Sequence, residues 1–247
     1  LMNNKINTKY HEGLVSFTPD GKTMYFSRES YFEKDFEKDS LSKVRYSQLY
    51  LFKATKLGDD WDTIESLAVN SENYSVKNPS VSADGATLYF SSNMPGGYGN
   101  FDIYKAAINE DGTIGEPENL GQKVNTEGQE MFPYISSNNT LYFSSNGHLG
   151  LGGMDVFYTK VIDGKMAPVR NVGIPINSNG DDFAFSINEE TEEGFVSSNR
   201  DGGQGSDDVY AFKKLQPLCD VLITATVLDD VTRAPLYGAS VSLYDAE

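Results

Sequence analysis

A segment that recurs three times constrains the fold of this sequence most. Each copy begins with Ser-Ser-Asn, continues through a glycine-rich loop and ends with Asp, an aliphatic residue and an aromatic one; the copies occupy 91–104, 144–157 and 197–210. Equivalent Asn and Asp residues are 53 positions apart at each step. A fixed period of this kind is typical of stacked supersecondary units, and about 40–50 residues suit a four-stranded propeller blade. The repeat therefore predicts a β-propeller.

Within each unit, short strands alternate with turn signals. In the second unit we expect the innermost strand at 79–82, the next at 87–91 and the third at 102–106, with Asp84-Gly85 and Asp111-Gly112 as hairpin turns. The strands are rich in aromatic and β-branched residues and are interrupted by Gly and Asn, which predicts an all-β domain with almost no helix. Four blades are recognisable, and they start near residues 13, 79, 133 and 183.

The two ends of the repeat array leave the number of blades open. Residues 1–8 have the pattern of an outer strand without its blade, whereas the fourth unit has no recognisable outer strand after 210–213. One interpretation is that the N-terminal strand completes the last blade and closes a ring of four. The other, which we favour, is that a further blade precedes Leu1, so that the natural domain has five or more.

Two segments depart from the repeat. An insertion at 29–46 stands where the other units have the glycine-rich loop, and Tyr50 takes the place of the repeated Asp. A solvated loop, a short helix and a partner-specific insertion are all open interpretations of it.

After Leu215-Gln216-Pro217, strands are expected at 221–227 and 236–244, but about thirty residues are too few for an independent β-sandwich core. We therefore assign 1–215 to the propeller and 216–247 to a truncated β-sandwich.

Composition narrows the function classes. The formal charge is −16 and the isoelectric point is about 4.5, so the surface repels nucleic-acid backbones and anionic lipid headgroups. The single Cys219 cannot form an internal disulfide. No apolar run reaches the roughly 18–20 residues of a membrane-spanning helix. No signal peptide is recognisable; if the protein is exported, its signal has been removed or lies upstream of Leu1.

The repeated strand pairs carry a resemblance. Residues 16–27 and 81–91 resemble the WD40-like PD40 repeats of TolB-type periplasmic propellers, and the tail around Asp229, Pro235-Leu236, Gly238-Ala239 and Val241 resembles the start of a carboxypeptidase-regulatory-like domain. This order is similar to that of the OmpA-family proteins of Bacteroidetes, including PorE-like components of the type IX secretion system. The resemblance implies a non-enzymatic, periplasmic, outer-membrane-associated scaffold with envelope proteins as partners. In that family a peptidoglycan-binding OmpA-like domain follows the sandwich, and no residue of this sequence corresponds to it.

The glycine-rich loops invite a ligand interpretation, but a structural one is favoured. They open no helix and lack the Lys-Ser/Thr pair of a phosphate-binding loop. We expect the repeated Asp102, Asp155 and Asp208 to accept hydrogen bonds from loop amides. Calcium is the alternative, because Asp201 and Asp207 crowd the fourth loop, although no known calcium-loop spacing is matched. We therefore predict no cofactor and no metal.

A second set of acidic residues follows a repeated tripeptide of aliphatic residue, Asn and Ser or Thr. Glu12, Glu130 and Asp182 each come five residues after the Asn of such a tripeptide, and Ser75 occupies the same offset in the second unit. We expect the three carboxylates at the mouth of the central channel. Two interpretations stand: they anchor neighbouring blades through hydrogen bonds, or they serve a carbohydrate-active or glycan-binding propeller with a pair of acids.

The loop tips supply the predicted partner-binding residues, which are Met94, Tyr98, Phe101, Leu149, Leu151 and Met154. Exposed aromatic, Met and aliphatic tips on adjacent blades suit a protein partner, and the alternative is that they fold back over the blade edges. Catalytic residues are not predicted, because only His11 and His148 are available and no Gly-x-Ser-x-Gly motif occurs.

Overall fold

The computed structural model describes residues 5–34, 37–38, 45–162, 165–215 and 226–238. Within these ranges the chain is built from β-strands, with a single 3-10 turn, η1 (Ser30–Glu33), and no α-helix. The chain divides into two compact units, Leu1–Lys214 and Leu215–Glu247. In the described ranges, no helix is long and apolar enough to cross a membrane.

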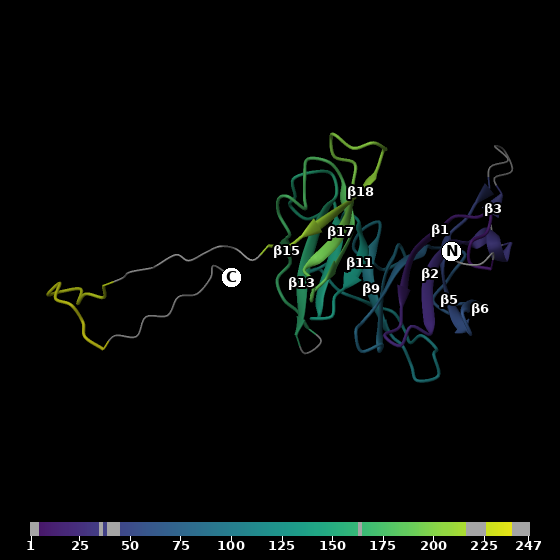
Figure 1. The fold of residues 1–247 in the computed structure, drawn as a ribbon, viewed down its shortest axis with the longest axis horizontal. Helices are drawn as coiled ribbons and strands as arrows, with labels where there is room; N and C mark the ends of the chain where they lie inside the picture. Colours follow the sequence, from purple (N-terminus) through teal and green to yellow (C-terminus); the bar gives the residue numbers. More distant parts are fainter. Residues whose placement is uncertain (1–4, 35–36, 39–44, 163–164, 216–225, 239–247) are drawn as a thin grey trace. The chain divides into compact units, whose positions relative to one another are not determined.

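The first unit is a β-propeller arrangement of four antiparallel blades, as the repeat predicts (Figure 1). The first blade consists of β1 (Glu12–Phe17), β2 (Thr23–Glu29), β5 (Leu49–Leu57) and β6 (Asp60–Ser66). The second consists of β7 (Val76–Val81), β8 (Thr87–Ser92), β9 (Asp102–Ala107) and β10 (Glu118–Asn119). The third consists of β11 (Glu130–Ile135), β12 (Thr140–Ser145) and β13 (Asp155–Ile162), with the short β14 (Lys165–Met166) and β15 (Arg170–Asn171) both pairing with β13. The fourth has β16 (Asp182–Asn188), β17 (Glu193–Ser198) and β18 (Asp208–Lys213).

The third strands of blades two to four begin at the repeated aspartates, Asp102, Asp155 and Asp208, as the spacing predicts. In the first blade, Tyr50 faces Arg28 at the register position where Asp102 faces Ser92. The insertion at 29–46 contains η1 and two short strands of two residues each, β3 (Glu37–Lys38) and β4 (Arg45–Tyr46), which pair antiparallel. Ser30, at the start of η1, is buried, and its backbone N–H donates to the carbonyl of Gln48.

Every innermost strand contains a register shift that the sequence did not predict. The shifts lie between residues 12 and 15, 77 and 80, 131 and 134, and 183 and 186. In the last three blades the extra residue has a positive φ: Asn78 (55°), Phe132 (54°) and Ala184 (52°). A bulge of this kind bends a strand and increases its twist, and it recurs here at the same place in each blade.

Consecutive blades pack face to face around three hydrophobic clusters. Tyr25 and Leu51 of the first blade pack with Val69, Leu88 and Phe90 of the next, and equivalent clusters join the second blade to the third and the third to the fourth. The innermost β7 contacts β1, β2 and β5; β11 contacts β7, β8 and β9; β16 contacts β11, β12 and β13. Among the described strands, no contact of this extent joins the first blade to the fourth, and β6 and β18 lie at different ends of the unit (Figure 1).

The N-terminal segment lies on the first blade. Ile6 is buried against Met24, Phe26 and Phe52, and Arg28 donates to the carbonyls of Lys5 and Ile6. The described part of the second unit is a turn closed by a bridge between Leu228 and Pro235. Most residues of the strands expected at 221–227 and 236–244 lie outside the described residues.

Candidate functional site

The repeated aspartates fold the glycine-rich loops. Asp102 accepts hydrogen bonds from the backbone N–H groups of Tyr98 (2.6 Å) and Gly99 (3.0 Å). The other two loops repeat the arrangement: Asp155 accepts from Leu151 and Gly152, and Asp208 from Gln204 and Gly205. Each carboxylate thus satisfies two amides of its own loop, as Asx side chains do in turns.

Glycine is required in these loops by close packing between blades. The N–H of Asn100 donates to the carbonyl of Gly128, which lies in the segment leading to the third blade. A Cβ added at Gly99 would overlap the carbonyl of Gly128, and one added at Gly152 would overlap the carbonyl of Gly180. The loops therefore pack against the segments that contain the tripeptides. Together they form the loop face, made of residues 93–101, 146–154 and 199–207 with 124–129 and 174–181.

The Asn of each tripeptide holds the third strand of the preceding blade. Asn125 Oδ1 accepts from the N–H of Ile103 (2.8 Å), and its Nδ2 donates to the same residue's carbonyl (3.0 Å). Asn177 does the same to Val156, and Asn70 to Leu51. One side-chain amide thus replaces a strand partner at the blade junction. The recurrence of the tripeptide was the signal in the sequence, but the sequence does not reveal this pairing.

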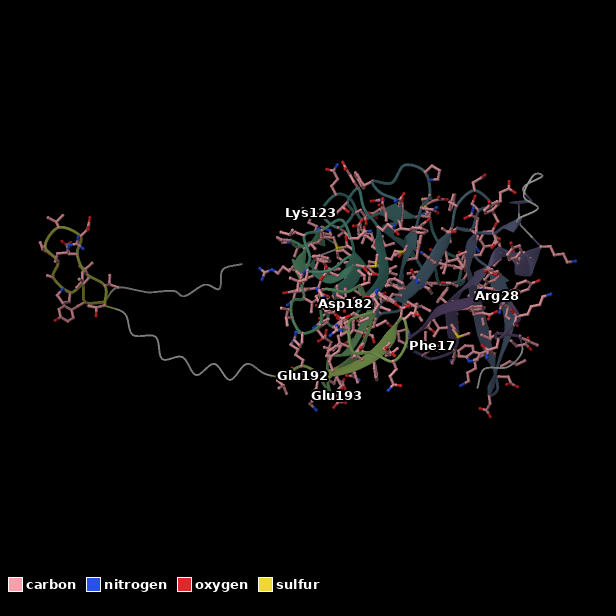
Figure 2. All side chains as sticks on the ribbon, turned by 90° about the horizontal axis from the view of Figure 1, so that it is seen from above. Phe17, Arg28, Lys123, Asp182, Glu192 and Glu193 are labelled. Atoms are coloured by element: carbon pink, nitrogen blue, oxygen red, sulfur yellow. The ribbon has the colours of Figure 1, made fainter. Side chains whose placement is uncertain are left out.

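The predicted channel-mouth carboxylates are the first residues of three innermost strands. Glu130 accepts from the N–H and hydroxyl of Thr126 and from the hydroxyl of Ser145. Asp182 accepts from the N–H and hydroxyl of Ser178 and from Arg200, and Glu12 accepts from Thr8 and lies 3.3 Å from Arg28 Nε. Glu130 and Asp182 are fully buried, and Figure 2 shows Asp182 within the body of the unit.

The second blade has no carboxylate at this register position. Val76, which faces Ser92, is the counterpart of Glu130 facing Ser145, whereas Ser75, the residue indicated by counting from Asn70, precedes the strand. Counting five residues from the Asn fails here because the second blade has one more residue between its Asn and the start of its innermost strand. Among the described residues, no three His, Cys, Asp or Glu side chains are grouped as metal ligands would be.

The predicted partner-binding residues separate into two groups. Tyr98, Leu149 and Leu151 are exposed, Leu149 by 95%. The other three make contacts within the unit, and Met94 packs against the cluster between the first and second blades. Phe101 forms a β-bridge with Gln129, and Lys77 Nζ lies over its ring. The backbone of Met154 is hydrogen-bonded to Asp181 and Asp182. Sequence reasoning missed Ile174, which is also largely exposed and precedes the tripeptide of the fourth blade.

Two of the exposed tips, Leu151 and Ile174, border an open pocket of about 460 Å³ on the loop face. Leu151, Ile174 and Pro175 supply apolar walls, and Asn177, Ser178, Asn179 and Arg200 supply polar ones. The guanidinium of Arg200 donates to the carbonyls of Pro175 and Ile176 and to Asp182, and it lies over the ring of Tyr210. These bonds hold the polar wall in place, so the pocket combines a fixed base with apolar tips.

A second pocket, of about 490 Å³, is lined by residues of the third and fourth blades and is acidic. Tyr134, Ile187 and Phe195 line it together with Glu189, Glu190 and Glu193. The hydroxyl of Tyr134 donates to the carbonyl of Ile187 and so joins the two blades. Figure 2 shows Glu192 and Glu193 at the margin of the unit, away from Asp182.

Comparisons with known proteins bear on the fold. No protein-family model and no curated protein matches the chain. Among solved structures, TolB from Acinetobacter baumannii is similar, with a TM-score of 0.53 and 11% identity over 83% of this chain and 42% of that one. A puromycin-hydrolyzing peptidase from Mycobacterium tuberculosis is also similar, with a TM-score of 0.48 and 12% identity over 83% of this chain and 30% of that one. Prolyl oligopeptidase B from Galerina marginata has a TM-score of 0.48 and 15% identity over 83% of this chain and 26% of that one.

The chain thus spans less than half the length of these structures. The likeness to TolB shows a TolB-like β-propeller fold, in agreement with the four blades.

Proposed function

We propose that this propeller is a non-enzymatic scaffold that binds an envelope protein through its loop face. The observation that carries the proposal is the set of exposed apolar tips Leu149, Leu151 and Ile174, the last two of which line a pocket whose polar base is held by Arg200. An aliphatic centre with a polar border is the usual composition of a protein-binding patch. A carbohydrate-active mechanism has less support, because two of the three carboxylates it would use, Glu130 and Asp182, are buried and hydrogen-bonded within the blades.

The cellular setting that we infer for this propeller is the bacterial envelope. The PD40-like repeats and the tail support an origin in a periplasmic, outer-membrane-associated protein of the OmpA family. Within that family, a role in the type IX secretion machinery fits a binding module without catalytic residues. Envelope proteins are therefore the expected partners.

The test is a comparison of two surface variants with the same number of substitutions. Leu149→Ser/Leu151→Ser/Ile174→Ser removes the tips, and Leu57→Ser/Ile162→Ser/Leu215→Ser removes exposed aliphatic residues outside the loop face. Envelope proteins crosslinked to the wild-type chain are identified by mass spectrometry, and the affinity for the purified partner is then measured. We expect the tip variant to bind at least about tenfold more weakly, as for a central interface patch, and the control to bind like wild type.

Equal binding by both variants, with native circular dichroism, would contradict the loop-face proposal. Glycan hydrolysis or binding that depends on Glu130→Gln or Asp182→Asn would favour the carbohydrate alternative.

A further inference from the structure

The outward side of the fourth blade repeats a surface that the other three blades bury. Leu51, Ile103, Val156 and Val209 hold the same register position, each opposite a Ser of the second strand. The first three are completely buried, whereas Val209 is 70% exposed. On the second strand, Tyr25, Tyr89, Tyr142 and Phe195 are likewise equivalent, and Phe195 is 55% exposed. Phe195, Val209 and the exposed Ala211 form the outer face of the fourth blade.

In each internal junction this surface is covered by the tripeptide of the next blade. The aliphatic residue packs on the cluster: Val69 beside Leu51, Val124 beside Ile103 and Ile176 beside Val156. The following Asn bonds both backbone groups of the same third-strand residue. In the part of the chain that the structure describes, no Asn makes this pair of bonds to Val209.

The chain contains one more tripeptide of this kind, Ile6-Asn7-Thr8, and it is held on the first blade as the others are held on theirs. Ile6 is buried against Phe26 and Phe52, as Val124 is buried against Phe143 and Phe157. Thr8 bonds Glu12 through its N–H and hydroxyl, as Thr126 bonds Glu130. The first blade therefore has the architecture of a blade that follows another.

Exposed residues on β1 extend this matching surface. Phe17 faces Met24 as Val81 faces Leu88, and Val81 packs into the junction with the preceding blade. Phe17 is exposed, as are Leu14 and Val15 on the same strand. Within one chain, the first blade and the fourth share no extended contact among the described strands.

We propose that the outer face of the fourth blade binds the first blade of a second copy of this chain, with the Ile6-Asn7-Thr8 tripeptide of that copy placed on Val209. The contact continues an interface that the molecule already makes three times. Because it joins two different surfaces, two copies can close on each other, and the resulting eight blades lie within the usual range for propellers. With a formal charge of −16 on each copy, association is expected to strengthen as salt screens the repulsion.

The first experiment measures the molar mass of the 27.2 kDa chain by light scattering across protein and salt concentrations. We expect a two-chain species. Val209→Asp should weaken association at least about tenfold, because it places a charge in the buried centre of the junction. Val231→Asp, at an even more exposed valine in the second unit, is the matched control and should associate like wild type. A single-chain mass under all conditions, or equal association of Val209→Asp and wild type, would overturn the proposal.

The second experiment separates contact between chains from closure within one chain. In a Cys219→Ser background, chains carrying Asn7→Cys are mixed with tagged chains carrying Val209→Cys, and the mixed disulfide is quantified. We expect this disulfide to form faster than the one between Asn7→Cys and Leu149→Cys chains, which use an exposed loop tip. In a chain carrying both Asn7→Cys and Val209→Cys, an internal disulfide without doubling of mass would show a ring of four and overturn the proposal.

Discussion

The third and fourth blades carry the same pattern of residues but bury different parts of it. Val156 in β13 and Val209 in β18 share a register position, yet the first is 0% exposed and the second 70%. Tyr142, which is partly buried in the junction, and Phe195, which is 55% exposed, are a second equivalent pair with a smaller contrast. Both blades use an Asp to fold their glycine-rich loop, so the difference does not lie in the blade itself.

The contrast shows that each face of a blade is buried only by the neighbouring blade that packs on it. The second face of the third blade is covered by Ile176 and Asn177 of the next tripeptide and by Phe185 and Val196 of the fourth blade. Stability in such an array is approximately a sum of units and nearest-neighbour interfaces. The same substitution should therefore have very different effects in the two blades.

The largest effect is expected from a charge placed at the equivalent valines. Val156→Asp should lower the free energy of unfolding by about 4 kcal/mol or more, because it buries an unpaired carboxylate, whereas Val209→Asp should change it by no more than about 0.5 kcal/mol. Urea unfolding of both variants, at protein concentrations where each is a single chain, measures the difference. Similar losses in both would mean that the fourth blade is covered in solution.

An intermediate effect is expected from the Asn that joins these two blades. Asn177→Ala removes both side-chain bonds to the backbone of buried Val156 and should cost about 2–3 kcal/mol, since each buried group left without a partner costs about 1–3 kcal/mol. Asn109→Ala, in an exposed turn of the second blade, is the control and should cost less than about 0.5 kcal/mol. If the two variants unfold alike, the amide bonds do not stabilise the junction.

The smallest effect at neutral pH is expected at Tyr142, whose counterpart Phe195 cannot ionise. Burial, with the nearby Glu189 as a lesser cause, raises the pKa of Tyr142 above its ordinary value of 10. Above pH 10 the unfolded chain loses this proton more readily than the folded one, so stability should fall as pH rises beyond that point. Tyr142→Phe should reduce the alkaline loss relative to wild type, as measured by thermal unfolding between pH 8 and about 11. An identical pH profile for the two proteins would show that another group is responsible.

Part of the candidate site followed from the sequence because its residues act locally. Asp102, Asp155 and Asp208 bond amides three or four positions away, and their 53-residue spacing set the starts of the third strands correctly. The sequence did not predict which loop tips are exposed, because this depends on contacts with other strands. Phe101 contacts Lys77 of another strand, whereas Leu149 is 95% exposed to solvent. Ile174 was missed for the same reason, since nothing in its local sequence shows that it borders a pocket.

The sequence by itself determined the four blades, their strand order and the glycine-rich loops, because period, turn residues and alternation are properties of neighbouring positions in the chain. Only the tertiary structure decided where the innermost strands bulge, since Phe132 and Ala184 have no intrinsic preference for a positive φ. It also decided that Val76 stands in register with Glu130, and that Val156 is buried while Val209 is exposed. Burial of a sheet face depends on what another part of the chain places against it, and no local pattern records that.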